Sequence, residues 1–78
     1  MDKSIYTARQ KRFCALIRQA RKDAGMTQQE LADALGRPQS FVAKIENGER
    51  RVDVVELLEL AEAIKFNPLI FLEKMAIP

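Results

Sequence analysis

The chain has 78 residues, of which 47% are hydrophobic and 31% charged, so it is long enough for one small globular domain and too apolar for a disordered segment. A single cysteine and no histidine exclude an internal disulfide, a Cys/His zinc site and a histidine-based nucleophile, and no apolar run suits a membrane span or a secretory signal. The net charge of +2 is uneven: residues 1–25 carry seven basic and two acidic side chains, whereas residues 53–78 carry two basic and five acidic ones. Solvated helix faces alone would account for this asymmetry, but it also suits a polyanionic partner that binds one side of the protein. We expect a cytoplasmic protein that needs no cofactor or metal.

The apolar residues recur with a helical period along nearly the whole chain, and no stretch alternates as a strand does, so the predicted fold class is all-α. The first helix is expected over about residues 6–24, and Gly25 suits a left-handed end to it. Lys11, Arg18 and Lys22 fall opposite its apolar stripe, where we expect contact with solvent rather than with phosphate. The stripe itself consists of Tyr6, Phe13, Leu16, Ile17, Ala20 and Ala24.

Two short helices joined by a glycine-containing turn are expected over about residues 27–47. Thr27 and Glu30 form a capping-box pattern at the start of the first, and Gly36 ends it. Pro38 suits the first position of the second helix. The outward face of this second helix contains no acidic residue and consists of Gln39, Ser40, Ala43, Lys44 and Asn47. The pattern is typical of a helix-turn-helix motif, whose second helix enters the major groove of DNA.

Asp53 and Glu56 form a second capping-box pattern, at the start of a fourth helix. The expected buried stripe of that helix is Val54, Leu57, Leu58, Leu60, Ala61 and Ile64. A fifth helix over about residues 67–76 begins at Asn67, with Pro68 at the favoured first position. It carries more apolar surface than one small core needs, so we expect a dimer interface there, although the same residues would also complete a monomer core. The expected interface residues are Ile70, Phe71, Leu72, Met75 and Ile77.

The segment TQQELADALGRPQSFVAKIENGER, residues 27–50, resembles the Cro/cI-type (XRE-type) helix-turn-helix family of phage repressors and small bacterial transcriptional regulators. The positions that match the family pattern are Gln28, Leu31, Ala32, Gly36, Gln39, Ser40, Val42, Ala43, Ile45, Glu46 and Gly48. The resemblance covers about residues 17–68 and implies a compact five-helix, lambda-repressor-like DNA-binding domain that spans residues 1–78. Pro38 departs from the pattern, because it lacks the hydroxyl with which the usual Ser or Thr contacts a phosphate.

The chemistry of the side chains agrees with the roles that the resemblance implies. A glutamine amide pairs with adenine N6 and N7, a serine hydroxyl pairs with donors or acceptors on base edges, and a lysine ammonium group reaches guanine or a phosphate. The residues expected to contact bases are Gln39, Ser40 and Lys44. The resemblance implies that Gln28 also braces Gln39, and that the residues contacting the DNA backbone are Gln28, Asn47, Arg50 and Arg51. It also implies a structural ion pair between Arg21 and Glu46, which joins the first helix to the third.

The predicted function is a sequence-specific DNA-binding transcriptional regulator, such as a repressor, that binds a palindromic operator as a homodimer. Small controller proteins of restriction–modification systems are similar in size and layout, and they are one possible subtype beside a prophage regulator. The alternative is an antitoxin or another protein-interaction module, whose apolar C-terminal helix binds a partner protein. An enzyme is disfavoured, because histidine is absent and a chain this short has no room for a deep cleft.

Overall fold

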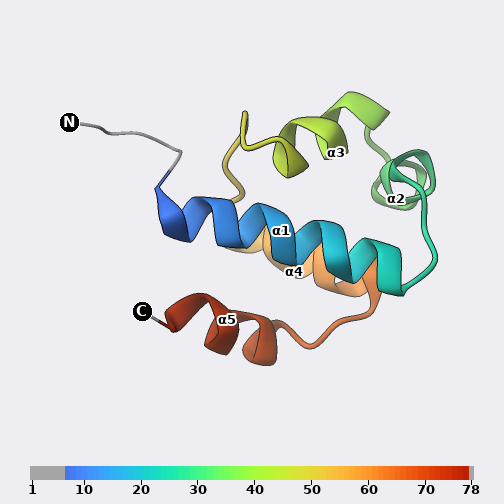
Figure 1. Ribbon diagram of the computed structural model, residues 1–78. Helices are drawn as coiled ribbons and strands as arrows, with labels where there is room; N and C mark the ends of the chain where they lie inside the picture. Colours follow the sequence, from blue (N-terminus) through green and yellow to red (C-terminus); the bar gives the residue numbers. More distant parts are fainter. Residues whose placement is uncertain (1–6, 78) are drawn as a thin grey trace.

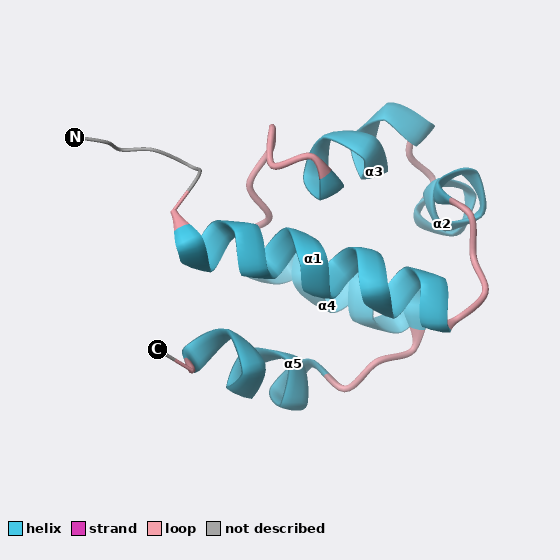
Figure 2. Cartoon of the chain, in the orientation of Figure 1, coloured by secondary structure: helices cyan, strands magenta, loops and turns pink. Residues whose placement is uncertain are grey.

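Five helices follow one another along residues 7–77, the part of the chain that the computed structural model describes. They are α1 (Ala8–Asp23), α2 (Gln28–Leu35), α3 (Gln39–Glu46), α4 (Val54–Ile64) and α5 (Pro68–Ala76). The connections between them are loops, and these residues include no strand (Figure 2). The predicted all-α, five-helix fold is therefore confirmed, although Tyr6, which was expected in the first helix, lies outside the described residues. No helix within residues 7–77 has the length and apolar character needed to cross a bilayer.

Local sequence explains where most helices begin. In α2 the backbone N–H of Glu30 donates to the Thr27 hydroxyl at 3.0 Å, and the Glu30 carboxylate accepts from the Thr27 N–H at 2.8 Å. Asp53 and Glu56 make the same reciprocal pair at the start of α4. Both predicted capping boxes are therefore present. Pro38 differs from the prediction, because it is the N-cap of α3 in an extended conformation and gives that helix no side-chain cap.

The turn between α2 and α3 depends on one glycine. Gly36 ends α2 with φ 68°, in the left-handed region that a side chain with a Cβ adopts only at a cost. Only Arg37 and Pro38 separate this glycine from the first residue of α3. The reversal is therefore tight enough for α2 and α3 to pack directly against each other.

The core lies where all five helices meet (Figure 1). In Figure 1 the pair α2 and α3 lies above the long helix α1, with α4 behind α1 and α5 below. The packed pairs include α1 with α3, α2 with α4, and α5 with both α1 and α4. The buried core residues are Ile17, Leu31, Ala32, Val42, Ile45, Leu57, Leu60, Ile64 and Phe71. Because α1 and α2 each bury one side against α3, they fix the direction of its outward face.

Helix α5 closes this core through Phe71, which is 5% exposed. Its ring packs edge-on against Phe13 of α1 at a centroid distance of 5.5 Å and stacks on Phe66 at 4.9 Å. The Arg12 guanidinium also donates to the carbonyl oxygen of Ile77, at the end of α5. The assignment of Phe71 to a dimer interface is therefore wrong: the inward edge of α5 completes the monomer, and only its other sides remain exposed.

Candidate nucleic-acid interface

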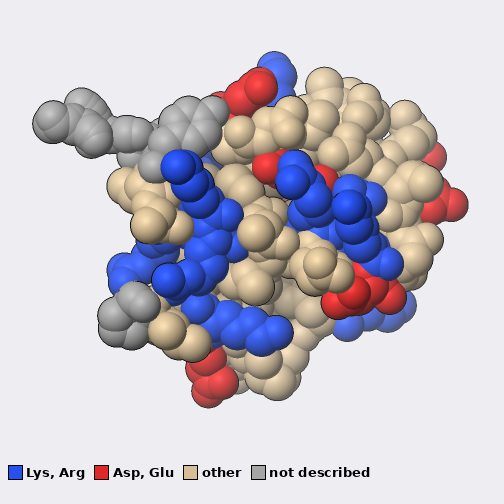
Figure 3. Space-filling view, viewed as in Figure 1, with Lys and Arg blue, Asp and Glu red and all other residues tan. Residues whose placement is uncertain are grey.

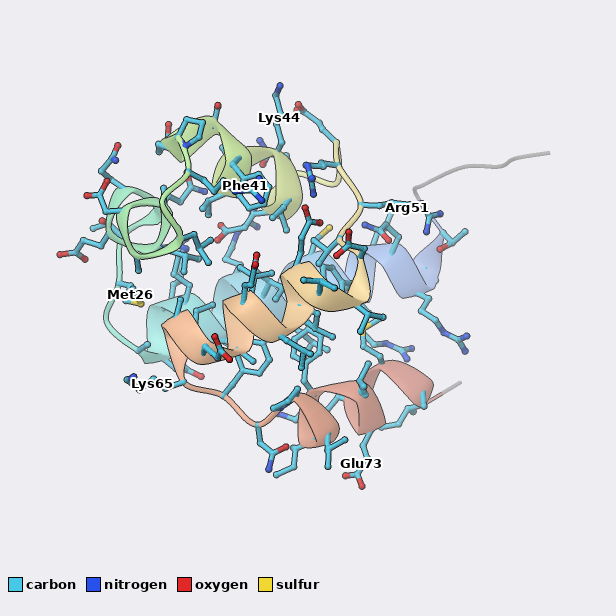
Figure 4. The ribbon with its side chains drawn as sticks, turned by 180° about the vertical axis from the view of Figure 1, so that it is seen from behind. Met26, Phe41, Lys44, Arg51, Lys65 and Glu73 are labelled. Atoms are coloured by element: carbon cyan, nitrogen blue, oxygen red, sulfur yellow. The ribbon has the colours of Figure 1, made fainter. Side chains whose placement is uncertain are left out.

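The outward face of α3 is exposed and polar. Val42 and Ile45 turn inward and are about 1% exposed, so they fix the rotation of the helix about its axis. Gln39, Ser40 and Lys44 are all exposed on the other side. In Figure 4 the Lys44 side chain points away from the body of the molecule. The three residues expected to contact bases therefore share one accessible face, which carries amide, hydroxyl and ammonium groups.

A chain of hydrogen bonds holds the first of these side chains. The Gln39 Nε2 atom donates to Gln28 Oε1 at 2.6 Å, and Gln28 Nε2 donates to Glu46 Oε1 at 3.0 Å. Gln28 is the first residue of α2, whereas Gln39 and Glu46 are the two ends of α3. The brace between Gln28 and Gln39 that the resemblance implied is present, and it continues inward to a buried carboxylate.

That carboxylate is clamped by two arginines of α1. Arg21 Nε lies 2.6 Å from Glu46 Oε2, and Arg21 Nη2 lies 3.0 Å from Glu46 Oε1, so the expected ion pair is bidentate. The Glu46 side chain is fully buried and that of Arg21 is 9% exposed. Burial alone would raise the pKa of Glu46, but hydrogen bonds from Arg21, Gln28 and Arg18 outweigh it and lower that pKa. Glu46 is therefore ionised at neutral pH.

Arg18 is the second clamp, and its position corrects the expectation of a solvent-facing side chain. Its Nε atom lies 3.3 Å from Glu46 Oε1, and its Nη2 donates to the backbone oxygen of Glu46 at 3.2 Å. The side chain is still 44% exposed. Arg18 precedes Arg21 by three residues, a spacing that places both on neighbouring parts of the helix surface and that could have indicated the contact.

The two arginines after α3 differ in their surroundings. Arg50 forms a bidentate pair with Glu56 at 2.7 and 2.8 Å, and its guanidinium lies 4.6 Å from the centre of the Phe41 ring. The guanidinium of Arg37 lies 4.5 Å from the same ring. Arg51 is exposed (Figure 4), and Asn47 is the exposed C-cap of α3. Of the two arginines expected to contact phosphates, Arg50 therefore already joins α3 to α4 within the monomer.

The Arg50–Glu56 pair predicts a pH dependence of stability. The hydrogen bonds from Arg50 lower the pKa of Glu56 to about 2, from an ordinary 4.5. Since the folded-state pKa is depressed, the stabilisation is present above pH 4.5 and is lost as the pH falls towards 2. As the pH falls across this window, we expect the urea midpoint of Glu56→Gln to fall less steeply than that of the wild type. The part of this pH dependence that comes from Glu46 should remain in both proteins. Parallel profiles for the two proteins would contradict the role given to Glu56.

Basic side chains gather on the face of the molecule that α1 dominates. Figure 3 shows Lys and Arg side chains spread along α1 and across its junction with α5. The exposed basic residues of α1 include Arg9, Lys11 and Lys22, and Arg12 and Arg18 are half-buried. The uneven charge of the sequence is therefore also uneven in space, and two of these basic residues, Lys11 and Arg18, lie beside the C-terminal end of α3.

Comparison with known proteins identifies the family of this chain. A helix-turn-helix family model matches residues 17–71. An XRE-family like protein from Pseudomonas syringae pv. tomato str. DC3000 is 48% identical, with a TM-score of 0.82 over 87% of this chain and 83% of that one. The chain belongs to the XRE-type helix-turn-helix family. This places it among DNA-binding transcriptional regulators, a family that is not enzymatic.

Other solved structures share the fold of this XRE-type domain. The restriction-modification controller protein C.AhdI from Aeromonas hydrophila is 32% identical, with a TM-score of 0.76 over 83% of this chain and 98% of that one. The controller protein C.Esp1396I, solved as a tetramer in complex with its natural 35 base-pair operator, is 20% identical, with a TM-score of 0.78 over 88% of this chain and 91% of that one. At this identity the likeness to C.Esp1396I shows the fold alone. No curated protein matches the sequence at a significant level.

The XRE-type domain also exposes an apolar surface away from α3. Val54 and Leu58, which were expected in the buried stripe of α4, are 72% and 47% exposed. Glu59 and Ala63 of α4 line a pocket with residues of α2, so this flank of α4 faces α2. Val54 and Leu58 are on the opposite flank of α4 and therefore lie towards α5. The sequence pattern placed Val54 and Leu58 inside because the apolar arc of α4 is wider than the part that its neighbours cover.

Helix α5 has a matching apolar flank. Ile70 and Lys74 line a groove of about 360 Å³ between α5 and α1. Leu69 and Leu72 are on the opposite flank of α5 and therefore lie towards α4. Leu69 and Leu72 are 70% and 48% exposed. We call the set Val54, Leu58, Leu69 and Leu72 the α4–α5 apolar surface. Of the other residues expected at an interface, Ile70 and Ile77 are exposed outside this set, and Met75 is half-buried.

Proposed function

We propose that the protein is a sequence-specific transcriptional regulator that binds a palindromic operator as a homodimer, with α3 in the major groove. The observation that carries the proposal is the exposed face of α3, where a braced amide, a hydroxyl and an ammonium group stand together without an acidic side chain. An α-helix fits the width of the major groove, and these groups match the donors and acceptors of base edges. Membership of the XRE-type family supports the same function.

The proposed roles divide the polar residues into two groups. Residues on the outward face of α3 contact base edges: Gln39, Ser40 and Lys44. Residues at the margins of that face contact the DNA backbone: Gln28, Asn47, Arg50 and Arg51. Contacts with phosphates fix the position of the protein, whereas contacts with base edges supply the sequence preference.

The homodimer is proposed from the α4–α5 apolar surface. Four large apolar side chains on neighbouring flanks of two packed helices form a patch of the kind that marks an interaction site on a soluble protein. A two-fold axis through such a patch would bury it against its own copy and would give each dimer two recognition helices. One helix reads few base pairs, so the symmetric pair accounts best for useful specificity.

Selection of bound fragments from a random-DNA library tests this function. We expect the selected fragments to share an inverted repeat whose half-sites are centred about one DNA turn apart, roughly 34 Å. Purified protein should also dimerise alone. If the chain aggregates until a second protein is co-expressed, and selects no DNA sequence, the antitoxin alternative would replace this proposal.

The replacement Gln39→Ala tests the proposed readout. We expect it to lose about 1–3 kcal/mol of discrimination at one base pair of each half-site, because the amide would no longer meet the base edge. The measurement is binding to a panel of operators that differ by single base pairs. As a control, Arg51→Ala should weaken binding almost equally across the panel. An unchanged preference in Gln39→Ala would remove this residue from the base contacts.

A further inference from the structure

The groove between α1 and α5 is lined by residues of these two helices and of the connection from α4 to α5, and none of the described lining residues belongs to α2 or α3. We propose that this groove binds a small apolar molecule with one carboxylate group, which pairs with the ammonium group of Lys65. The inference goes beyond the proposed function, because it concerns a small-molecule ligand at a site away from the residues proposed to contact DNA.

The floor of the groove is apolar. Ile64 and Phe71 are buried, and Leu16, Ala20 and Phe66 beside them are half-buried. The rings of Phe66 and Phe71 stack at a centroid distance of 4.9 Å, so part of the floor is aromatic. The volume of about 360 Å³ lies within the range of sites that hold small molecules, roughly 300–1,000 Å³. Burial against this floor would stabilise the apolar part of such a molecule.

The rim of the groove carries an excess of positive charge. Its charged residues are Lys65, Lys74 and Asp23, and all three are exposed. Within residues 7–77 neither lysine forms an ion pair, whereas the Asp23 carboxylate accepts a hydrogen bond from the Gln19 amide at 2.7 Å. A ligand with one carboxylate would balance the two lysines and the aspartate, and a cationic ligand would add to the excess.

The backbone singles out Lys65 as the residue that pairs with the carboxylate. Lys65 lies where α4 ends and the chain turns towards α5 (Figure 4), with φ 74° and ψ 47°. The other residues of positive φ within residues 7–77 are Gly25, Gly36 and Gly48. A glycine adopts this left-handed conformation without strain, whereas a residue with a Cβ does not. Strained residues of this kind concentrate at ligand-binding positions.

The end of α4 does not itself require a lysine side chain. The backbone N–H of Lys65 donates to the carbonyl oxygen of Ala61 at 2.7 Å, and a glycine would make the same hydrogen bond. A lysine charge also interacts favourably with the carbonyl groups at a helix C-terminus. That structural role predicts that loss of the side chain lowers stability, whereas a role in ligand binding predicts a more stable protein that binds less well.

Phenylpropionate is the probe, because it joins an aromatic ring to a single carboxylate. In two-dimensional NMR spectra we expect saturable shifts of the backbone amide signals of Ala20, Phe66 and Ile70, which line the groove. The signals of Gln39 and Lys44 on α3 should stay unchanged. Phenylpropionamide has the same shape without the charge, and we expect it to bind about tenfold more weakly.

The replacement Lys65→Gly separates the two roles of the lysine. We expect it to weaken binding of phenylpropionate by about tenfold, because the charge-assisted contact is lost. The melting temperature should rise by a few degrees, since the left-handed conformation is no longer strained. The matched control is Lys22→Gln, which removes an exposed lysine of α1 that does not line the groove, and its affinity for the probe should equal that of the wild type.

Each remaining outcome would overturn the inference, and none involves DNA, so the proposed function is tested separately. If phenylpropionate shifts no groove signal, or the amide binds as tightly as the acid, the groove is not a carboxylate site. If Lys65→Gly binds the probe as tightly as the wild type, or melts at a lower temperature, the role given to Lys65 is wrong. If the groove signals shift on dilution of the protein without the probe, a second copy covers the groove and the small-molecule site is wrong.

Discussion

Replacement of Glu46 by alanine is expected to lower the free energy of unfolding by about 3–5 kcal/mol, the usual effect of removing one partner from a buried ion pair. The change would leave the buried Arg21 guanidinium without its bidentate carboxylate, and it would also remove the contact of Arg18 with the same group. The join between α1 and α3 would weaken with it. Urea unfolding followed by circular dichroism measures the loss. Glu49→Ala, at an exposed position three residues away, should change stability by less than about 0.5 kcal/mol.

A double replacement distinguishes the loss of the attraction between Arg21 and Glu46 from the cost of leaving the Arg21 charge buried and unpaired. Arg21→Met combined with Glu46→Leu removes both charges and keeps apolar volume at the site, so it should recover much of the stability that Glu46→Ala loses. The double variant still lacks the acceptor for Gln28, and we expect its base preference to be relaxed. A double variant as unstable as Glu46→Ala would show that the ion pair itself, and not an unpaired Arg21, dominates the effect.

Features that depend on neighbouring residues could be predicted from the sequence. Thr27 with Glu30 and Asp53 with Glu56 are three residues apart, so the geometry of one helical turn fixes their contacts. Gly36 is predictable for the same reason, since the backbone conformation it permits is a local requirement. The exposed positions on α3 follow from helical periodicity and from the short turn before that helix.

Features that depend on how helices cross were predicted less well. Periodicity shows how wide an apolar stripe is, but it does not show which flank a neighbouring helix covers. For this reason Val54 and Leu58 were expected inside, and Phe71 was expected at an interface. Arg18 and Arg50 were missed as structural residues because their partners, Glu46 and Glu56, approach from other segments of the chain.

Paired replacement of Leu58 and Leu72 by aspartate is expected to give a folded monomer whose operator affinity is lower by about 100-fold or more, because two linked half-site contacts become one. Both side chains are about half exposed in the monomer, so charge is tolerated there until a second copy covers it. Phe71→Asp would not report on the dimer, because that residue lies in the core and the charge would destabilise the fold.

Sedimentation and operator titration of the same samples measure this last effect. Dimerisation and specific binding should fail together, while weak non-specific binding persists, because the basic residues and the polar face of α3 are unchanged. The matched control is Ile70→Asp, on the flank of α5 that lines the groove against α1. If Ile70→Asp gives the monomer and the paired variant stays dimeric, the two-fold axis lies on the α1 side of α5. If both variants remain dimeric with full operator affinity, the α4–α5 apolar surface is not the interface, and the chain pairs through another part of its surface.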